Sequence, residues 1–78
     1  DVYKRQVVLN VDQKLGIVQL STGKGEGVSK GWKYHIVRNG KFVADVEITD
    51  VTKDRSYGKV VLRNGVVRIG DDAVANFD

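Results

Sequence analysis

Glycine and lysine gather in residues 23–41 of this 78-residue chain, so phosphate binding is the first chemistry to test. A P-loop needs two glycines five residues apart followed by Lys and Ser or Thr, and a dinucleotide-binding loop needs Gly-x-Gly-x-x-Gly or Ala before a helix. Neither spacing occurs, because Val28 and Lys30 occupy the positions where the dinucleotide pattern requires a small residue. The stretch therefore predicts a loop between two strands, in which glycines adopt positive φ.

Catalytic and metal-binding groups are sparse. His35 is the single histidine and the chain has no cysteine, so the usual zinc ligand sets cannot be assembled. Asp45 and Glu47 share one outward strand face near Asp50, but no histidine or second acidic strand joins them for acid–base work, and a solvated face is the interpretation. Asp71 is interpreted as a turn residue that accepts hydrogen bonds from nearby backbone N–H groups. We predict no catalytic residue, no cofactor and no metal, and hence a protein that is not an enzyme.

Basic residues near aromatic residues are the functional signal that remains. Five of them cluster against one acidic residue, Glu26, and form the candidate partner-binding set: Lys24, Lys30, Lys33, Arg38 and Lys41. Outward-facing rings would let bases stack, but Trp32 and Tyr34 are in phase with Ile36 and are predicted to face the core. The net charge of +3 is modest beside the basic patches of nucleic-acid-binding proteins. Nucleic-acid binding through residues 24–41 is therefore kept as the alternative function.

Strands must supply the frame for these residues, because no segment repeats apolar residues at helical spacing over three turns. Short β-branched and aromatic segments recur instead between clusters of Gly, Asn and Asp, which is typical of strands. The pattern predicts five or six strands, over residues 3–11, 16–21, 32–38, 41–51, 57–63 and, briefly, 66–69.

Two Asn-Gly pairs punctuate these strands. Asn39-Gly40 and Asn64-Gly65 each tolerate the positive φ of a tight turn, so both predict hairpins. Side chains alternate around the first turn, and one set is predicted to fill the core: Trp32, Tyr34, Ile36, Phe42, Ala44, Val46 and Ile48. The other set is predicted to point outward: Lys33, His35, Lys41, Asp45 and Glu47, together with Val37 and Val43. Because that outer face is not wholly polar, part of it is expected to be covered.

Several short antiparallel strands with one apolar face leave open edges in a flat sheet, and curling removes them. We therefore predict an all-β fold, a small, partly open antiparallel barrel of five to six strands, SH3-like or OB-like. The length suits one domain, residues 1–78, and a start at Asp1 without methionine suggests a piece of a longer protein. With 41% hydrophobic and 29% charged residues and no apolar run of transmembrane length, the composition indicates a soluble chain.

The turns also carry a family resemblance. Gly27-Val28-x-x-Gly31, then Asn39-Gly40 and the terminal Gly70-Asp71, stand in the order found in a β-barrel module of bacterial envelope proteins. Over residues 5–75 the chain resembles the C-terminal domain of the flagellar assembly protein T and the β domains of the rod-shape protein C. The resemblance implies an assembly or docking module without catalysis, in the periplasm or cell envelope more than in the cytoplasm. It implies no ligand residues.

These observations predict a non-enzymatic protein-interaction module of a larger bacterial protein. A protein partner is expected to bind at a strand edge or at the loop of residues 23–31, where the outward lysines are available for contact. The alternative is a small nucleic-acid-binding barrel that uses the basic residues.

Overall fold

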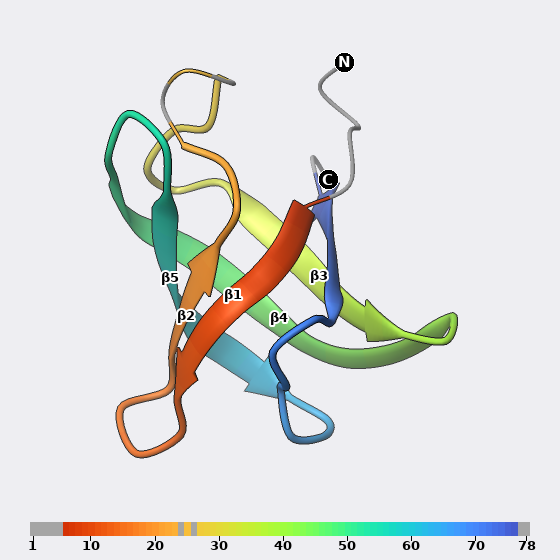
Figure 1. The fold of residues 1–78 in the computed structure, drawn as a ribbon. Helices are drawn as coiled ribbons and strands as arrows, with labels where there is room; N and C mark the ends of the chain where they lie inside the picture. The colour runs from red at the N-terminus through yellow and green to blue at the C-terminus, as the bar shows by residue number, and fades with distance from the viewer. Residues whose placement is uncertain (1–5, 24, 26, 77–78) are drawn as a thin grey trace.

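Six antiparallel strands form a closed barrel in the computed structural model, which describes residues 6–23, 25 and 27–76 (Figure 1). The strands are β1 (Gln6–Asp12), β2 (Ile17–Leu20), β3 (Lys33–Arg38), β4 (Lys41–Val51), β5 (Ser56–Arg63) and β6 (Asp72–Asn76). Around the barrel their order is β1-β2-β5-β4-β3-β6, after which β6 pairs with β1. The predicted all-β antiparallel barrel is confirmed, and the barrel is closed where a partly open one was expected. None of the described residues belongs to a helix long and apolar enough to cross a membrane.

Strand β6 reaches its place by a Greek-key connection. β3, β4 and β5 are consecutive neighbours, and β6 then returns to lie beside β3, which gives the spatial order β6-β3-β4-β5. The hairpin predicted at Asn64-Gly65 is therefore wrong, because β5 lies between β2 and β4 and neither residue of the pair has a positive φ. The backbone N–H groups of Asn64 and Gly65 both donate to Val43 O instead, at 3.0 and 2.8 Å.

The short strand predicted over residues 66–69 is also wrong, because this segment is part of the loop between β5 and β6. Of its apolar side chains Val67 is buried, 3% exposed, whereas Val66 is 55% exposed. The β5–β6 loop lies at the same end of the barrel as the β1–β2 turn (Figure 1). Val67 of this loop belongs to the core cluster, and its carbonyl oxygen accepts a hydrogen bond from Gln13 Nε2 at 2.8 Å. The apolar residues of this segment include one that closes the core, Val67, and the sixth strand is β6, at residues where none was predicted.

Inward-facing side chains of the strands form the core, with one residue from each of two loops. The buried apolar residues are Val8, Val18, Leu20, Val28, Tyr34, Ile36, Val43, Ala44, Val46, Ile48, Val67 and Ala73. Trp32, which was predicted to face the core, is half-buried and packs against this cluster.

β3 and β4 form the predicted hairpin at Asn39-Gly40, where φ is 52° and 76°. One extra residue in β4, Val43, lies between the partners of Ile36 and Val37 and forms a β-bulge. The bulge buries both Val43 and Ala44 and turns Phe42 outward, so Val43 is 5% and Phe42 36% exposed. The predicted directions of Phe42 and Val43 are thus reversed.

The glycine-rich stretch connects β2 to β3, as predicted, at the end of the barrel opposite the β5–β6 loop (Figure 1). Gly27 and Gly31 have positive φ, 89° and 88°. The loop rests on the β4–β5 turn, because Gly25 N–H donates to Lys53 O at 3.0 Å. Gly23 approaches this turn so closely that a Cβ atom there would lie 2.4 Å from Arg55 N.

Candidate functional site

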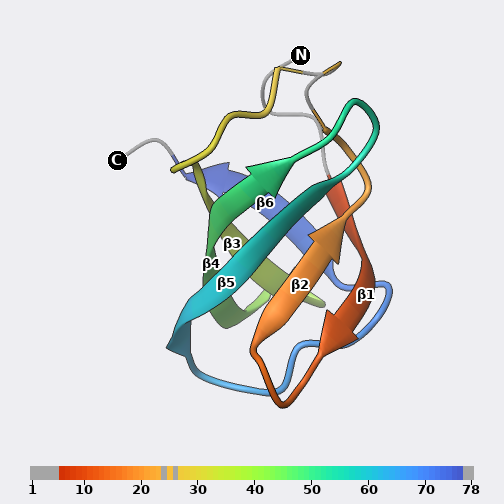
Figure 2. The ribbon, with the colours of Figure 1, turned by 90° about the vertical axis from the view of Figure 1, so that its left-hand side faces the viewer.

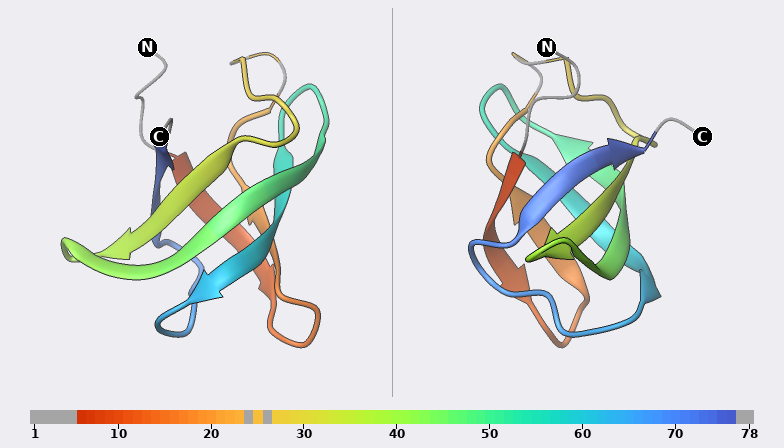
Figure 3. Two further views of the ribbon diagram at one scale, coloured as in Figure 1. Left: turned by 180° about the vertical axis from the view of Figure 1, so that it is seen from behind. Right: turned by 90° about the vertical axis from the view of Figure 1, so that its right-hand side faces the viewer.

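Apolar side chains form a patch on the outside of β3, β4, β5 and β6. The strands β3 and β4 face the viewer in the left panel of Figure 3. Directly opposite residues of antiparallel strands point to the same face, with Cβ atoms about 5 Å apart. The pairs of one row are Leu62↔Asp45, Asp45↔His35 and His35↔Val74. The neighbouring row contains the pair Val37↔Phe42. We call the patch made by Val37, Phe42, Leu62 and Val74 around His35 and Asp45 the outer apolar face.

Two β-bulges place the most exposed members of this face. The bulge in β4 turns Phe42 outward, as described above. A second bulge inserts Val61 into β5 between the partners of Val46 and Asp45. As a result two successive apolar side chains lie at the surface, Val61 at 53% and Leu62 at 56% exposure.

His35 and Asp45 form a hydrogen-bonded pair at the centre of the face, through His35 Nδ1 and Asp45 Oδ1. The imidazole also meets the Phe42 ring edge-on, with ring centroids 6.0 Å apart at an interplanar angle of 76°. The rows on either side of the pair contain no serine, threonine or cysteine among the described residues. The pair therefore has no nucleophile to activate there, and what it offers is a polar contact inside an apolar patch.

Basic side chains border the outer apolar face. On one side the row Lys33↔Glu47↔Lys59 sets two lysines around a half-buried glutamate. On the other side Asp72 lies opposite Val37, and the exposed Lys41 and Arg63 stand at the adjoining ends of β4 and β5. The border of the face is thus more positive than negative.

The structure separates the five basic residues that the sequence singled out. Lys33 and Arg38 stand at the two ends of β3, about 16 Å apart at the rise of a strand. Lys30 lies in the loop before β3, beside a shallow cavity that Val28 and Val51 also line. Lys24 lies outside the described residues. Of the predicted set, Lys33 and Lys41 border the outer apolar face.

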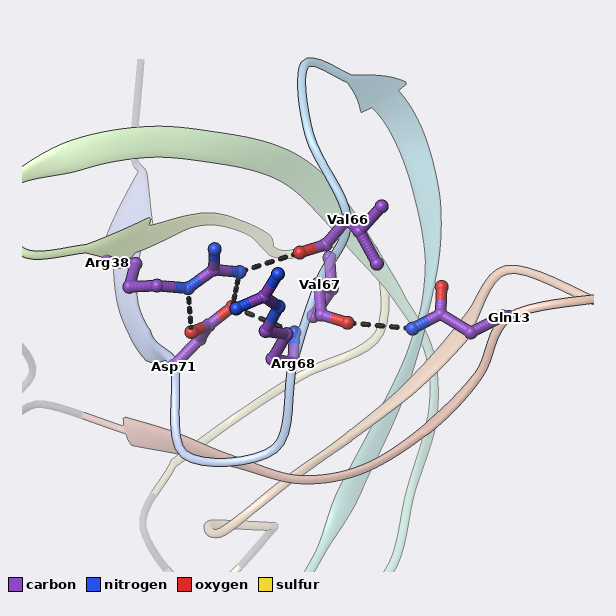
Figure 4. A network of polar contacts seen from close by, with 6 residues as sticks. All are labelled: Gln13, Arg38, Val66, Val67, Arg68 and Asp71. Atoms are coloured by element: carbon purple, nitrogen blue, oxygen red, sulfur yellow. Dashed lines mark hydrogen bonds and ion pairs between the residues drawn. The ribbon is translucent and has the colours of Figure 1, made fainter.

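Arg38 does not extend freely into solvent but holds the β5–β6 connection (Figure 4). Its Nε donates to Asp71 Oδ1 at 2.8 Å and its Nη2 to Asp71 Oδ2 at 2.9 Å. The same Nη2 donates to Val66 O at 2.6 Å. The predicted backbone contact of Asp71 is confirmed, because Arg68 N–H donates to its Oδ2 at 2.9 Å. These hydrogen bonds, those from Arg38 first, hold the pKa of Asp71 below its ordinary value although burial opposes the shift.

Among the described residues, no group of three or more His, Cys, Asp and Glu side chains is arranged to hold a metal ion. Asp45 is committed to His35 and Asp71 to Arg38. Sequence analysis missed Leu62 and Phe42 as site residues. Their position depends on the two bulges, and the one signal in the sequence was the mixed outer face noted around Val37.

Comparisons with known proteins do not assign a family to this chain. No protein-family model matches it, and no curated protein is significantly similar to it in sequence. The resemblance to envelope barrel modules thus stays a prediction.

Proposed function

We propose that this chain is a non-enzymatic protein-interaction module of a larger, envelope-associated bacterial protein, and that a partner docks on the outer apolar face. The docking proposal rests on the exposure of Phe42 and Leu62, which is 36% and 56%. Other side chains fill the core of the barrel, so these two are not needed there. Contiguous apolar side chains at a surface, rimmed by polar ones, are typical of interaction sites. The envelope assignment rests on the family resemblance.

The outer apolar face lies beside an open edge of β5, to which a strand of the partner can be added. Val60 N–H donates to Gly16 O at 2.8 Å, and β2 begins at the next residue, Ile17. Residues 61–63 of β5 therefore extend beyond β2. A partner strand added there would place its side chains beside Leu62.

The charges around this edge favour an acidic partner over a second copy of the chain. Antiparallel self-pairing of the open residues 61–63 would be centred on Leu62 and would set Val61 opposite Arg63, so it would gain no pair of opposite charges. An extended segment with apolar residues flanked by Glu or Asp would meet both the apolar face and its basic border.

A peptide titration followed by NMR tests this proposal. The probe is a synthetic peptide of alternating Val and Glu, and its matched control alternates Val and Lys. We expect backbone amide shifts at His35, Phe42 and Leu62 with the acidic peptide, and at least tenfold weaker binding of the basic one. Phe42→Ser combined with Leu62→Ser should abolish binding, whereas Ile69→Ser, at a 67% exposed residue outside the face, should leave it unchanged.

Labelled single-stranded DNA and RNA, titrated at low and physiological salt, complete the test. Phosphate contacts weaken steeply with salt. If an oligonucleotide binds in that manner and shifts residues 27–41 while the acidic peptide does not bind, the docking proposal is overturned in favour of the nucleic-acid alternative. Shifts confined to the loop with the acidic peptide would move the docking site away from the outer apolar face.

A further inference from the structure

A second surface, on the outside of β1, β2 and β5, faces the viewer in Figure 2. It carries a small groove that docking on the outer apolar face does not use. Its volume is about 120 Å³, and it is lined by Asn10, Val11, Asp12, Ile17, Gln19 and Tyr57. The strand register explains the set, because Asn10 lies opposite Gln19 and Gln19 lies opposite Tyr57. Three strands thus present an amide, an amide and a phenol side by side on one face.

Two of the polar side chains are held in place by the backbone. Asn10 Oδ1 accepts a hydrogen bond from Val11 N–H at 2.9 Å, which leaves the amide N–H₂ of this groove-lining residue as a donor. Asp12 Oδ1 accepts one from Leu15 N–H at 3.0 Å, which leaves its second oxygen as an acceptor. Because these groups are already oriented, a ligand does not have to order them.

Gln19 and Tyr57 supply the other polar groups. Gln19 Nε2 donates to Tyr57 Oη over a long 3.5 Å. Within the described part of the chain, neither the Gln19 carbonyl oxygen nor the Tyr57 hydroxyl hydrogen takes part in another hydrogen bond, and both are available to a ligand. The groove therefore offers both donors and acceptors beside a half-buried aromatic ring, with Val11 and Ile17 as apolar neighbours.

Charge and size narrow the ligand class. Asp12 lines the groove and Asp50 lies opposite Tyr57, whereas Lys59 is the one basic residue next along the outer face of β5. Carboxylates repel phosphate but accept hydrogen bonds from hydroxyl groups. The volume is well below the roughly 300–1,000 Å³ of sites for drug-sized molecules, so the groove has room for a single ring.

The geometry points to a carbohydrate site, in which Tyr57 packs against one neutral pyranose ring while Asn10, Asp12 and Gln19 bond its hydroxyl groups. A sugar ring has an apolar face for the phenol and hydroxyls that both donate and accept, which matches the lining of the groove. This site lies on strands other than β3 and β4. The carbohydrate proposal therefore does not depend on whether a partner docks on the outer apolar face.

The test is an NMR titration of the wild-type protein with glucose, galactose and mannose, and separately with uridine and uridine monophosphate. The side-chain amide signals of Asn10 and Gln19 report on the groove directly. We expect them to shift with at least one hexose and not with uridine monophosphate. Asn10→Ala, at an exposed residue, and Tyr57→Ala should each weaken hexose binding at least tenfold. Phe42→Ala, at an exposed aromatic residue of the outer apolar face, should not.

Three outcomes would overturn the assignment. Hexoses that leave both side-chain amide signals unmoved at millimolar concentrations exclude a sugar site in the groove. Binding of uridine without any hexose would assign the groove to a nucleobase. Hexose binding that survives both Asn10→Ala and Tyr57→Ala would place the sugar elsewhere on the barrel.

Discussion

Among single residues, Asp71 ties the long β5–β6 connection to the rest of the barrel. Its side chain is 4% exposed and accepts hydrogen bonds from Arg38 Nε, Arg38 Nη2 and Arg68 N–H. The same hydrogen bond from Arg38 raises the pKa of that guanidinium. The contact joins the end of β3 to a loop more than two dozen residues later, so its loss should be felt as a loss of stability.

Asp71→Asn is expected to lower the free energy of unfolding at neutral pH by about 1–2 kcal/mol, because charged hydrogen bonds are replaced by weaker neutral ones. The pKa of Asp71 is lower in the folded state than its ordinary value of 3.8. Its contribution is therefore fully present above that value and is lost as the pH falls through the lowered pKa. Urea unfolding over a pH series should show that the difference in unfolding free energy between the wild type and Asp71→Asn disappears below about pH 4.

Asp54→Asn, in the exposed β4–β5 turn, is the control for this prediction and should unfold like the wild type. A gap that persists unchanged into acid would contradict the prediction.

Ser56 makes the opposite case. Its Oγ atom is buried and has no hydrogen-bond partner in the described part of the chain. Burying an unpaired hydroxyl costs free energy that a methyl group does not. Ser56→Ala should therefore leave stability unchanged or raise it by up to about 1 kcal/mol, measured by thermal unfolding. A clear loss of stability would show that the hydroxyl has a partner.

At the scale of elements, local chemistry predicted the parts of the fold that depend on neighbouring residues. Asn39-Gly40 specifies a tight turn by its own backbone preferences, and the structure has the predicted β3–β4 hairpin there. Asn64-Gly65 has the same letters, but its surroundings are set by Val43 on another strand. The outer apolar face could not be predicted from the sequence for the same reason. Phe42 and Leu62 face outward because of β-bulges, and these form only when strands pair.

Pairing of β4 with β5 also depends on one glycine. A Cβ atom at Gly58 would lie 2.2 Å from Val46 Cγ1 and 3.0 Å from Glu47 O. Gly58→Ala must push β4 and β5 apart and is expected to lower the free energy of unfolding by about 1–3 kcal/mol in chemical denaturation. Gly65→Ala is the matched control, because its Cβ would meet Val43 Cγ1 at an ordinary 3.8 Å and its φ is not positive. Equal effects of the two substitutions would show that glycine flexibility, not space, decides.

For the whole molecule, closure of the barrel depends on its shortest seam. Among the described residues β1 and β6 pair at two positions, Gln6↔Ala73 and Val7↔Asp72, whereas β3 and β4 pair at six. The loop before β6 extends the seam, because Val8 N–H donates to Asp71 O and Gly70 N–H to Val8 O, at 2.9 and 2.8 Å. Opening the barrel between β1 and β6 therefore breaks few backbone hydrogen bonds.

Amide hydrogen exchange should reveal this seam as the place where the barrel opens first. Val8 N–H and Ile48 N–H are both hydrogen-bonded, to Asp71 O at 2.9 Å and to Trp32 O at 2.7 Å, and both residues are at most 1% exposed. Burial alone would protect them equally. Because opening the seam breaks few bonds while the β3–β4 hairpin stays paired, Val8 N–H is expected to exchange at least tenfold faster than Ile48 N–H, as followed by NMR in deuterated water. Equal protection of the two amides would mean that the ring opens only when the whole barrel unfolds, so that the short β1–β6 seam is as strong as the pairing of β3 with β4.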